Sequence, residues 1–329
     1  MSIQPLKIIL DTDPGGDDSF AFLWLLSLVK QELAELVAVT SVDGNVHARL
    51  TFAAAAKLLA LCNMDGVEIG RGVIGGSQGD ADDAGAIHGE DGMGNLSHTL
   101  PDVIPDYETA RHADDVLIDA LQAAPGEITV VAIAPFTNLA AAERKCPGVL
   151  QLAKEIVIMA GAFQVPGNIT SEAEFNIAYD PEAAQFLFNC CTNIVVLPLD
   201  VTEHIVFTPE MAAQVSRVNP NSAIGQFVVA LCNFMTGTAM AFRETGGISG
   251  FLVHDAATLA YLFYPETLRF RRAQVQVETN GNWTRGKTLF DNRHKTKVGA
   301  NAWVALEVDA PNLLAAMLED LKLLVAEQG

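Results

Sequence analysis

The chain is poor in basic residues and in cysteine, and each shortage excludes a class of protein. Lys and Arg together number 20 against 40 Asp and Glu, which gives a formal net charge of -20. Nucleic-acid surfaces need clustered positive charge, so we expect no nucleic-acid partner and instead a small molecule or a cation. The five cysteines are odd in number and show no Cys-x-x-Cys spacing, so they indicate neither a disulfide framework nor a zinc site.

Targeting and membrane segments are also missing from the pattern. Residues 1–5 are too short and polar for a signal peptide and run straight into the first apolar stretch. No apolar run reaches the length that a membrane span needs. We therefore expect a cytoplasmic protein with no membrane partner.

Four carboxylates gather in one short stretch near the N-terminus. The apolar residues 8–10 lead into the acidic segment 11–18 (DTDPGGDD), and an apolar helical pattern follows over residues 20–29. The pattern predicts a strand, a tight acidic turn and a helix start. Two like charges about 4 Å apart repel by roughly 4 kcal/mol at an effective dielectric near 20. The four carboxylates therefore need a positive charge close to them. Oxygen ligands without a local His or Cys favour a hard cation, calcium or magnesium.

Two other interpretations of this acidic segment can be tested on the sequence. An EF-hand loop starting at Asp11 would need a bidentate Glu at its twelfth position, which is Phe22, so that interpretation fails. A haloacid dehalogenase-like phosphatase would use Asp11 as nucleophile and Asp13 as acid. It predicts a Lys after a later strand, and residues 159–163 and 199–201 contain none. It is kept as a less favoured alternative.

Strand-like and helix-like segments alternate along the first two thirds of the chain. The predicted strands lie at residues 8–10, 36–40, 67–69, 128–133, 155–159 and 193–200, with further β-like runs at 274–278 and 302–308. This alternation predicts an α/β fold with a mainly parallel central sheet and helices on both faces. No linker or repeat interrupts the chain, so we expect a single domain over residues 1–329.

Polar residues follow several of the predicted strands and should meet at one edge of the sheet. Ligands of such sheets bind beyond the carboxyl ends of the strands. The converging set contains carboxylates, amides and one His but almost no cationic side chain, which suits a neutral sugar better than a phosphate. Its members are Asp11, Asp13, Asp17, Asp18, Asn45, the backbone near Ile133, Asn168, Glu174, Asn176, His254 and Asp255.

At these positions the chain resembles the inosine-uridine preferring nucleoside hydrolase family. The resemblance rests on the segment 11–18 and covers nearly the full length, to about residue 310. Supporting motifs follow in the family's order: Gly44-Asn45, His88-Gly89-x-x-Gly92, Pro135-x-Thr137-Asn138, Met159-x-Gly161, Ala173-Glu174-Phe175-Asn176, Asp180-Pro181 and His254-Asp255.

The resemblance implies hydrolysis of the N-glycosidic bond of a ribonucleoside to ribose and free base, as in nucleoside salvage. It implies a calcium ion (Ca2+) that holds the ribose 2′- and 3′-hydroxyls and one water, with Asp17 as general base on that water. The implied metal ligands are Asp13, Asp18, Asp255 and the carbonyl of Ile133. The residues implied around the substrate are Asn45, His88, Met159, Asn168, Glu174 and Asn176, with Asp11 supporting the turn. A homodimer or homotetramer is the implied assembly.

Several assignments stay open at this level. His254 is the candidate acid for the leaving base, with His88 as the alternative residue that meets the base. Taken singly, His88 could be an exposed loop residue, His254 a helix cap, and Asn168, Glu174 and Asn176 turn or capping residues. Residue Ala134 departs from the family pattern and makes the Ile133 ligand less secure than the carboxylates. A non-catalytic nucleoside- or sugar-binding protein on the same scaffold is the second alternative.

The nucleobase preference is not fixed by these motifs. We expect base contacts from the loops at about 76–98 and 222–253, and a role for the Arg243–Glu244 pair near the base is one option. Neither loop contains a Trp that could sandwich a purine, which favours a broad or pyrimidine preference. The three Trp residues, at positions 24, 283 and 303, lie in apolar contexts and are interpreted as core.

Overall fold

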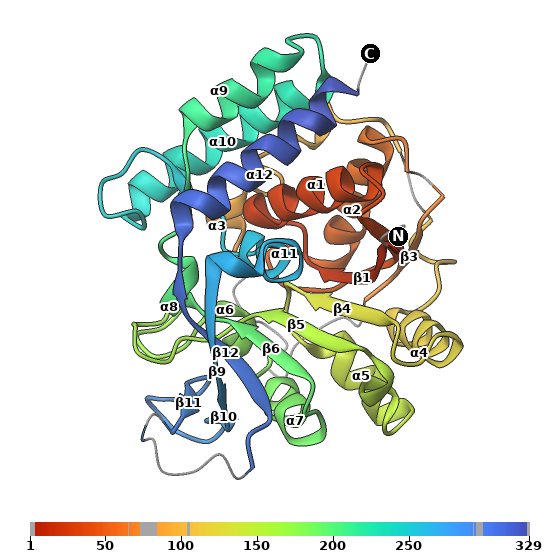
Figure 1. Cartoon of the computed structure of the whole chain (residues 1–329), viewed down its shortest axis with the longest axis vertical. Helices are drawn as coiled ribbons and strands as arrows, with labels where there is room; N and C mark the ends of the chain where they lie inside the picture. Colours follow the sequence, from red (N-terminus) through yellow and green to blue (C-terminus); the bar gives the residue numbers. More distant parts are fainter. Residues whose placement is uncertain are drawn as a thin grey trace.

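An eight-stranded sheet lies at the centre of the computed structural model, which describes residues 4–64, 66–72, 84–103, 106–291, 293 and 299–327. Its strand order is β3-β2-β1-β4-β5-β6-β12-β9, and every neighbouring pair in it is parallel except β12 with β9 (Figure 1). The strands are β1 (Leu6–Thr12), β2 (Ala34–Ser41), β3 (Glu68–Gly70), β4 (Ile128–Ala132), β5 (Glu155–Met159), β6 (Ile194–Leu197), β9 (Leu268–Ala273) and β12 (Ala302–Val308).

Helices cover both faces of this sheet, as Figure 1 shows. One face packs against α1 (Gly16–Lys30), α2 (Ala48–Leu61), α9 (Pro209–Val218), α10 (Ala223–Phe242), α11 (Ala256–Phe263) and α12 (Ala310–Ala326). The other face packs against α4 (Ala113–Ala123), α5 (Thr137–Lys145) and α7 (Pro181–Cys190). Alternate residues of β1 enter the two cores, Ile8 and Leu10 on one side and Ile9 on the other, as the strand period of two requires. The predicted parallel α/β fold is confirmed.

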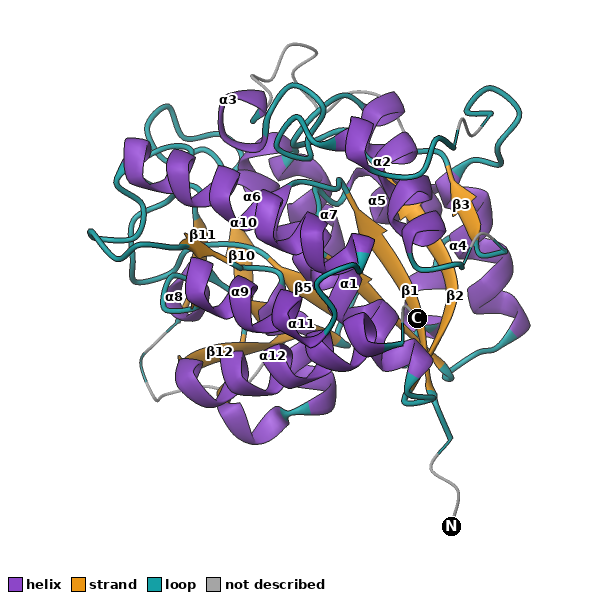
Figure 2. Ribbon diagram, turned by 90° about the horizontal axis from the view of Figure 1, so that it is seen from above, coloured by secondary structure: helices purple, strands orange, loops and turns teal. Residues whose placement is uncertain are grey.

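Shorter elements complete the described chain. They are the helices α3 (Gly85–His88), α6 (Phe175–Tyr179) and α8 (Leu199–Thr202), the 3-10 turns η1 (Ser97–Thr99), η2 (Val149–Leu152) and η3 (Pro265–Thr267), and the strand pairs β7 (Val206–Phe207) with β8 (Phe251–Leu252) and β10 (Val275–Val277) with β11 (Thr288–Phe290). Figure 2 shows the strands enclosed by helices, with α3 and neighbouring loops at one end of the molecule. Residues 76–83 of the predicted base-contacting loop lie outside the described residues, as do residues 1–3 of the polar N-terminus.

The structure corrects several sequence expectations about individual elements. Strand β9 was not predicted, because three of the six residues in its sequence LRFRRA are arginine; it is an edge strand, with Arg269 paired to Glu307 of β12. The strand predicted at 193–200 ends at Leu197, where Pro198 precedes α8. Trp24 is fully buried, but Trp283 is 90% exposed and Trp303 is 47% exposed, so the core interpretation was wrong for those two.

The expectation that no apolar run could span a membrane is also wrong by length and composition. Helix α10 has 20 residues and a mean hydropathy of 1.4. Half of the apolar stretch of α10 is buried inside the structure. The core helix of a folded protein can have the same length and composition, so α10 is weak evidence for a membrane segment.

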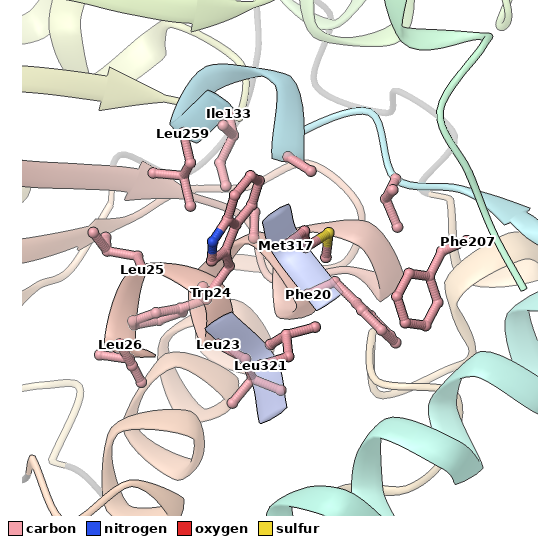
Figure 3. Close-up of a cluster of buried hydrophobic side chains, with 14 of the residues drawn as sticks. Phe20, Leu23, Trp24, Leu25, Leu26, Ile133, Phe207, Leu259, Met317 and Leu321 are labelled. Atoms are coloured by element: carbon pink, nitrogen blue, oxygen red, sulfur yellow. The ribbon is translucent and has the colours of Figure 1, made fainter. Parts of the chain in front are cut away.

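Helix α1 is buried on all sides along most of its length, from Gly16 to Leu28. Figure 3 shows its side chains, including Phe20 and Trp24, packed against Leu259 of α11 and Met317 and Leu321 of α12. A helix that is apolar all round belongs in a core rather than at a surface. Because α1 begins inside the acidic segment, this packing fixes the position of the carboxylates.

A buried carboxylate ties α1 to α12. Asp320 is 4% exposed, and its Oδ2 accepts hydrogen bonds from Trp24 Nε1 and Tyr264 Oη, each at 2.7 Å. Its Oδ1 accepts one from Gln31 Nε2 at 3.0 Å. This carboxylate accepts from two residues, one in α1 and one at its C-cap, and from Tyr264 at the end of α11, and so holds the core side of α1 in register with α12.

Replacing this acceptor should destabilise the fold. Asp320→Ala leaves the Trp24 and Tyr264 donors without their acceptor, and we expect a loss of about 2–4 kcal/mol in the free energy of unfolding. Urea unfolding followed by intrinsic fluorescence measures it. The neighbouring exposed variant Glu319→Ala, which loses only a surface pair with Lys322, should change stability by less than about 1 kcal/mol. Equal stability losses in the two variants would refute a structural role for Asp320.

Candidate active site

The polar residues predicted to converge do meet around one cavity beyond the carboxyl ends of the central strands. The cavity has a volume of about 660 Å³ and is lined by residues that follow β1, β2, β4 and β5, together with the end of α10 and the start of α11. Of the predicted residues, those that line it are Asp17, Asp18, Asn45, His88, Ile133, Met159, Asn168, Glu174, Asn176, His254 and Asp255. Asp11 and Asp13 lie behind this lining and are fully buried.

The acidic turn is packed too closely for side chains at two of its glycine positions. A Cβ on Gly15 would lie 2.5 Å from Asn45 Nδ2, and a Cβ on Gly44 would overlap Asp13 Oδ2. Glycine at both positions lets the segment after β2 approach the turn after β1. This approach brings the two predicted motifs into one site.

The carboxylates of the turn are buried together with Asp255. One oxygen from each of Asp17, Asp18 and Asp255 lies within 4.8 Å of the others. Burial and the neighbouring Asp18 raise the pKa of Asp17 to about 8, and burial raises the pKa of Asp18 to about 6. Burial and mutual repulsion raise the pKa values of Asp13 and Asp255 well above their ordinary range. Burial of the charged form is the main cause of these shifts, and repulsion between neighbouring carboxylates adds to it at Asp13, Asp17 and Asp255.

Residue Asp13 supplies the clearest sign that the group fits a metal ion. Its Oδ2 accepts a hydrogen bond from Asn45 N at 2.6 Å, but its Oδ1 is buried and has no hydrogen-bond partner among the described residues. An unpartnered buried carboxylate oxygen beside three further carboxylates is the arrangement that a hard cation would complete. The residues present therefore fit a divalent metal.

Asn45 has a structural role that the motif did not reveal. Its Nδ2 donates to Asp18 Oδ2 at 2.9 Å and to the backbone carbonyl of Asp13 at 3.1 Å. Both amide hydrogens are thus used to hold the acidic turn. Only Oδ1, which is an acceptor, is left for a ligand hydroxyl.

The supporting position of Asp11 is visible in its contacts. Its Oδ1 accepts hydrogen bonds from Thr40 Oγ1 at 2.5 Å and Asn138 Nδ2 at 2.8 Å, and burial raises its pKa to about 7. Asn138 also donates to the carbonyl of Ser41 at 2.9 Å. These bonds join the ends of β1 and β2 to the start of α5 beneath the cavity.

Ile133 presents its backbone rather than its side chain to the site. Figure 3 shows the side chain among the core residues beside Leu259. The carbonyl accepts a 3.3 Å hydrogen bond from Asn176 Nδ2, which also donates to the carbonyl of Met159 at 3.1 Å. Although Ala134 departs from the family pattern, Ile133 still lines the cavity.

Glu174 and Asn168 serve the local backbone as well as the cavity. Glu174 caps α6, because its carboxylate accepts from the amides of Asn176, Ile177 and Gly161, and burial raises its pKa to about 6. Asn168 is exposed at the cavity edge, and its Oδ1 accepts from the amide of Phe175 at 2.9 Å. The capping alternative is therefore correct for Glu174, which still faces the cavity.

Two neutral histidines also line the cavity. His88 Nδ1 accepts a 2.8 Å hydrogen bond from the backbone amide of Gly16, and His254 Nδ1 lies 2.8 Å from Thr202 Oγ1. Burial lowers the pKa of each to about 4, with a further contribution from His254 at His88. His88 is only 9% exposed, so the exposed-loop alternative is wrong. His254 bonds to Thr202 instead of capping α11, so the capping alternative is also wrong.

Sequence reasoning named Arg243 and Glu244 as one option near the base but missed Met235 and Phe242 of α10. All four line the cavity, and the left-handed backbone at Arg243 (φ 61°) ends the helix there. Phe242 is 55% exposed although it lines the cavity. The apolar helical pattern signalled a core helix only, and the rare left-handed non-glycine residue leaves no mark in a single sequence.

The chain is similar to known proteins over nearly its full length. A family model described as inosine-uridine preferring nucleoside hydrolase matches residues 8–315. The inosine-uridine preferring nucleoside hydrolase of Crithidia fasciculata is 33% identical over 97% of this chain and 98% of its own length. A probable uridine nucleosidase 1 of Oryza sativa is 32% identical over 95% of each chain.

A solved structure shares the fold over the same extent. The purine-preferring ribonucleoside hydrolase from Gardnerella vaginalis has a TM-score of 0.87 and 27% identity, covering 97% of this chain and 99% of its own. Because the family model spans the acidic turn, the segment that holds Asn168, Glu174 and Asn176, and the His254-Asp255 pair, the chain belongs to the inosine-uridine preferring nucleoside hydrolase family.

Proposed function

We propose that this protein hydrolyses the N-glycosidic bond of ribonucleosides to ribose and free base, with calcium as its resident cation. The proposal rests mainly on the cluster of buried carboxylates beside the cavity, in which Asp13 Oδ1 has no hydrogen-bond partner among the described residues. A neutral sugar with vicinal hydroxyls fits a cavity of carboxylates, amides and neutral histidines. Family membership supports the same reaction.

The proposed metal ligands are Asp13, Asp18, Asp255 and the carbonyl of Ile133. All are oxygen donors, which favours calcium over zinc or copper. When bound, the ion would neutralise the carboxylates, hold the 2′- and 3′-hydroxyls of ribose and modestly acidify water.

Asp17 is the proposed general base because it is the least engaged of the four carboxylates. Asp18 accepts from Thr12 Oγ1, the amide of Gly15 and Asn45 Nδ2, whereas Asp17 has only its own amide and the Asp255 carboxyl beside it. In the absence of a metal ion, burial and the neighbouring Asp18 raise the pKa of Asp17 to about 8, and a cation bound beside it would favour the ionised carboxylate that accepts a proton from water. A positioned base of this kind contributes about 10²- to 10⁴-fold to the rate.

The remaining side chains bind the sugar and meet the base. Asn45 offers an acceptor to a ribose hydroxyl, and Met159, Asn168, Glu174 and Asn176 form the facing wall. Carboxylate and carbonyl oxygens around the ring stabilise the positive charge that ribose develops as the bond breaks. His254 is the proposed donor to the leaving base: when the Thr202 hydroxyl donates to its Nδ1, the neutral ring carries its hydrogen on Nε2, which no described residue hydrogen-bonds.

We further propose that the chain is one domain and acts in the cytoplasm as a homodimer or homotetramer in nucleoside salvage. A broad or pyrimidine preference is proposed, since neither predicted base loop contains a Trp. Light scattering on the purified protein tests the assembly.

A nucleoside panel tests the reaction. Incubation with inosine, guanosine, adenosine, uridine, cytidine and thymidine should release reducing sugar from at least one ribonucleoside, and a calcium chelator should abolish the release. Tight ribose binding without loss of base from any nucleoside would favour the non-catalytic alternative. Magnesium-dependent release of phosphate from a phosphomonoester would favour the phosphatase alternative.

Paired substitutions test the division of roles within the acidic turn. Asp17→Asn should keep the metal but lose about 10²- to 10⁴-fold in kcat, because the amide cannot take up the proton. Asp13→Asn should lose the metal, because its unpartnered oxygen is central to the ligand set. Metal content by mass spectrometry and steady-state kinetics measure the two effects, and the exposed surface variant Asp119→Asn is the control. Equal metal content and equal activity in both turn variants would contradict the assignment.

Metal binding should also stabilise the fold. Calcium would relieve the repulsion among the buried carboxylates, and it would bind the folded state but not the unfolded one. Adding calcium to protein that has been stripped of metal with a chelator should therefore raise the apparent melting temperature. Differential scanning fluorimetry measures the shift. The same addition should leave the melting temperature of Asp13→Asn nearly unchanged, and an equal rise in that variant would place the stabilising calcium elsewhere.

A further inference from the structure

The loop at residues 88–97 is organised by one carboxylate that the proposed reaction does not use. Asp91 Oδ1 accepts hydrogen bonds from the amides of Met93 and Asn95, each at 2.8 Å. Its Oδ2 accepts from the amide of Ser97 at 2.9 Å. Three backbone amides on one half-buried carboxylate lower the pKa of Asp91, so it is ionised at neutral pH. A charged acceptor of this kind strongly favours one loop conformation.

This loop is pressed against the acidic turn. Gly92 has a φ of 75°, and a Cβ there would lie 2.7 Å from the carbonyl oxygen of Pro14. Met93 is fully buried, and the amide of Gly94 donates to the carbonyl of His88 at 2.7 Å. The position of His88 is thus coupled to the conformation that Asp91 holds.

The bond between His88 and Gly16 fixes the imidazole tautomer. A backbone amide can only donate, so the Nδ1 that accepts from Gly16 carries no proton. The neutral ring therefore carries its hydrogen on Nε2. No described residue hydrogen-bonds this Nε2, and His88 lines the cavity, so it presents an N–H donor and not an acceptor to a ligand.

We infer that Asp91 is a positioning residue, which holds the 88–97 loop so that His88 accepts the Gly16 amide and turns its Nε2–H toward the nucleobase. The chemical group recognised is a hydrogen-bond acceptor on the base, a carbonyl oxygen or an unprotonated ring nitrogen. This inference rests on the proposed nucleoside hydrolase function. It adds a residue that touches neither the substrate nor the metal ligands.

A double-mutant cycle tests the coupling through His88. Asp91→Ala should lower kcat/KM by about 10- to 100-fold, the scale expected when a contacting group is displaced. Asp91→Asn should recover part of that loss, because its Oδ1 can still accept from Met93 and Asn95. In a His88→Ala background, Asp91→Ala should cause little further loss, since its effect passes through the same imidazole. Additive losses in the double variant would overturn the inference.

Asp106→Ala is the matched control. Asp106 is an exposed loop carboxylate that accepts from the amides of Glu108 and Thr109 and does not line the cavity. It should leave kcat/KM unchanged. If Asp91→Ala and Asp106→Ala behave alike while the wild-type protein is active, the inference fails and the proposed function stands.

The tautomer provides a readout that does not depend on activity. Nitrogen NMR of protein labelled at histidine, with the His88 signals assigned from His88→Gln, should show protonated Nε2 and unprotonated Nδ1 in the wild-type protein. Asp91→Ala should move the His88 signals toward a tautomer mixture, whereas Asp106→Ala should not. A protonated Nδ1 in the wild-type protein would overturn the inference. If no nucleoside is hydrolysed but these spectra are found, the proposed function fails while the loop assignment holds.

Discussion

The repulsion among carboxylates buried at one point is the constraint on which the rest of this structure depends. Asp13, Asp17, Asp18 and Asp255 are nearly inaccessible to solvent. Burial raises the pKa values of all four, and mutual repulsion adds to the rise at Asp13, Asp17 and Asp255. Such a group is unfavourable in isolation, and a bound cation converts it into a strong site. Burying these carboxylates together therefore destabilises the fold locally, but it creates a site that suits a hard metal ion and a sugar.

The surrounding scaffold holds this group in place from three directions. Helix α1 is buried on all sides and fixes Asp17 and Asp18 at its first turn. The segment after β2 adds Asn45, which holds Asp13 and Asp18 with its backbone and side-chain amides. The 88–97 loop covers the turn from outside through Gly16 and Pro14. Rigid support of this kind is what a preorganised site requires, because small displacements of reacting groups are costly.

The cavity lining combines two kinds of chemistry. Glu174, Asn176 and the buried carboxylates are polar groups that suit a hydroxylated sugar. Two neutral imidazoles and the apolar Met235 and Phe242 are groups that suit a planar base. The relatives compared include one protein named for uridine and one named for purines.

The sequence by itself determined the fold class and most of the members of the site. Alternating apolar strands and helices leave a periodic pattern, and parallel strands bring their carboxyl ends to one edge, so residues as distant as Asp13 and Asp255 could be grouped. Tertiary structure alone decided how they act together. The two amide bonds of Asn45, the Gly16 donor on His88, the Asp91 loop and the side chains at the end of α10 depend on close approaches between distant segments. The exposed Trp283 and the charged edge strand β9 escaped prediction for the same reason: burial and strand pairing depend on neighbours in space, which local sequence does not record.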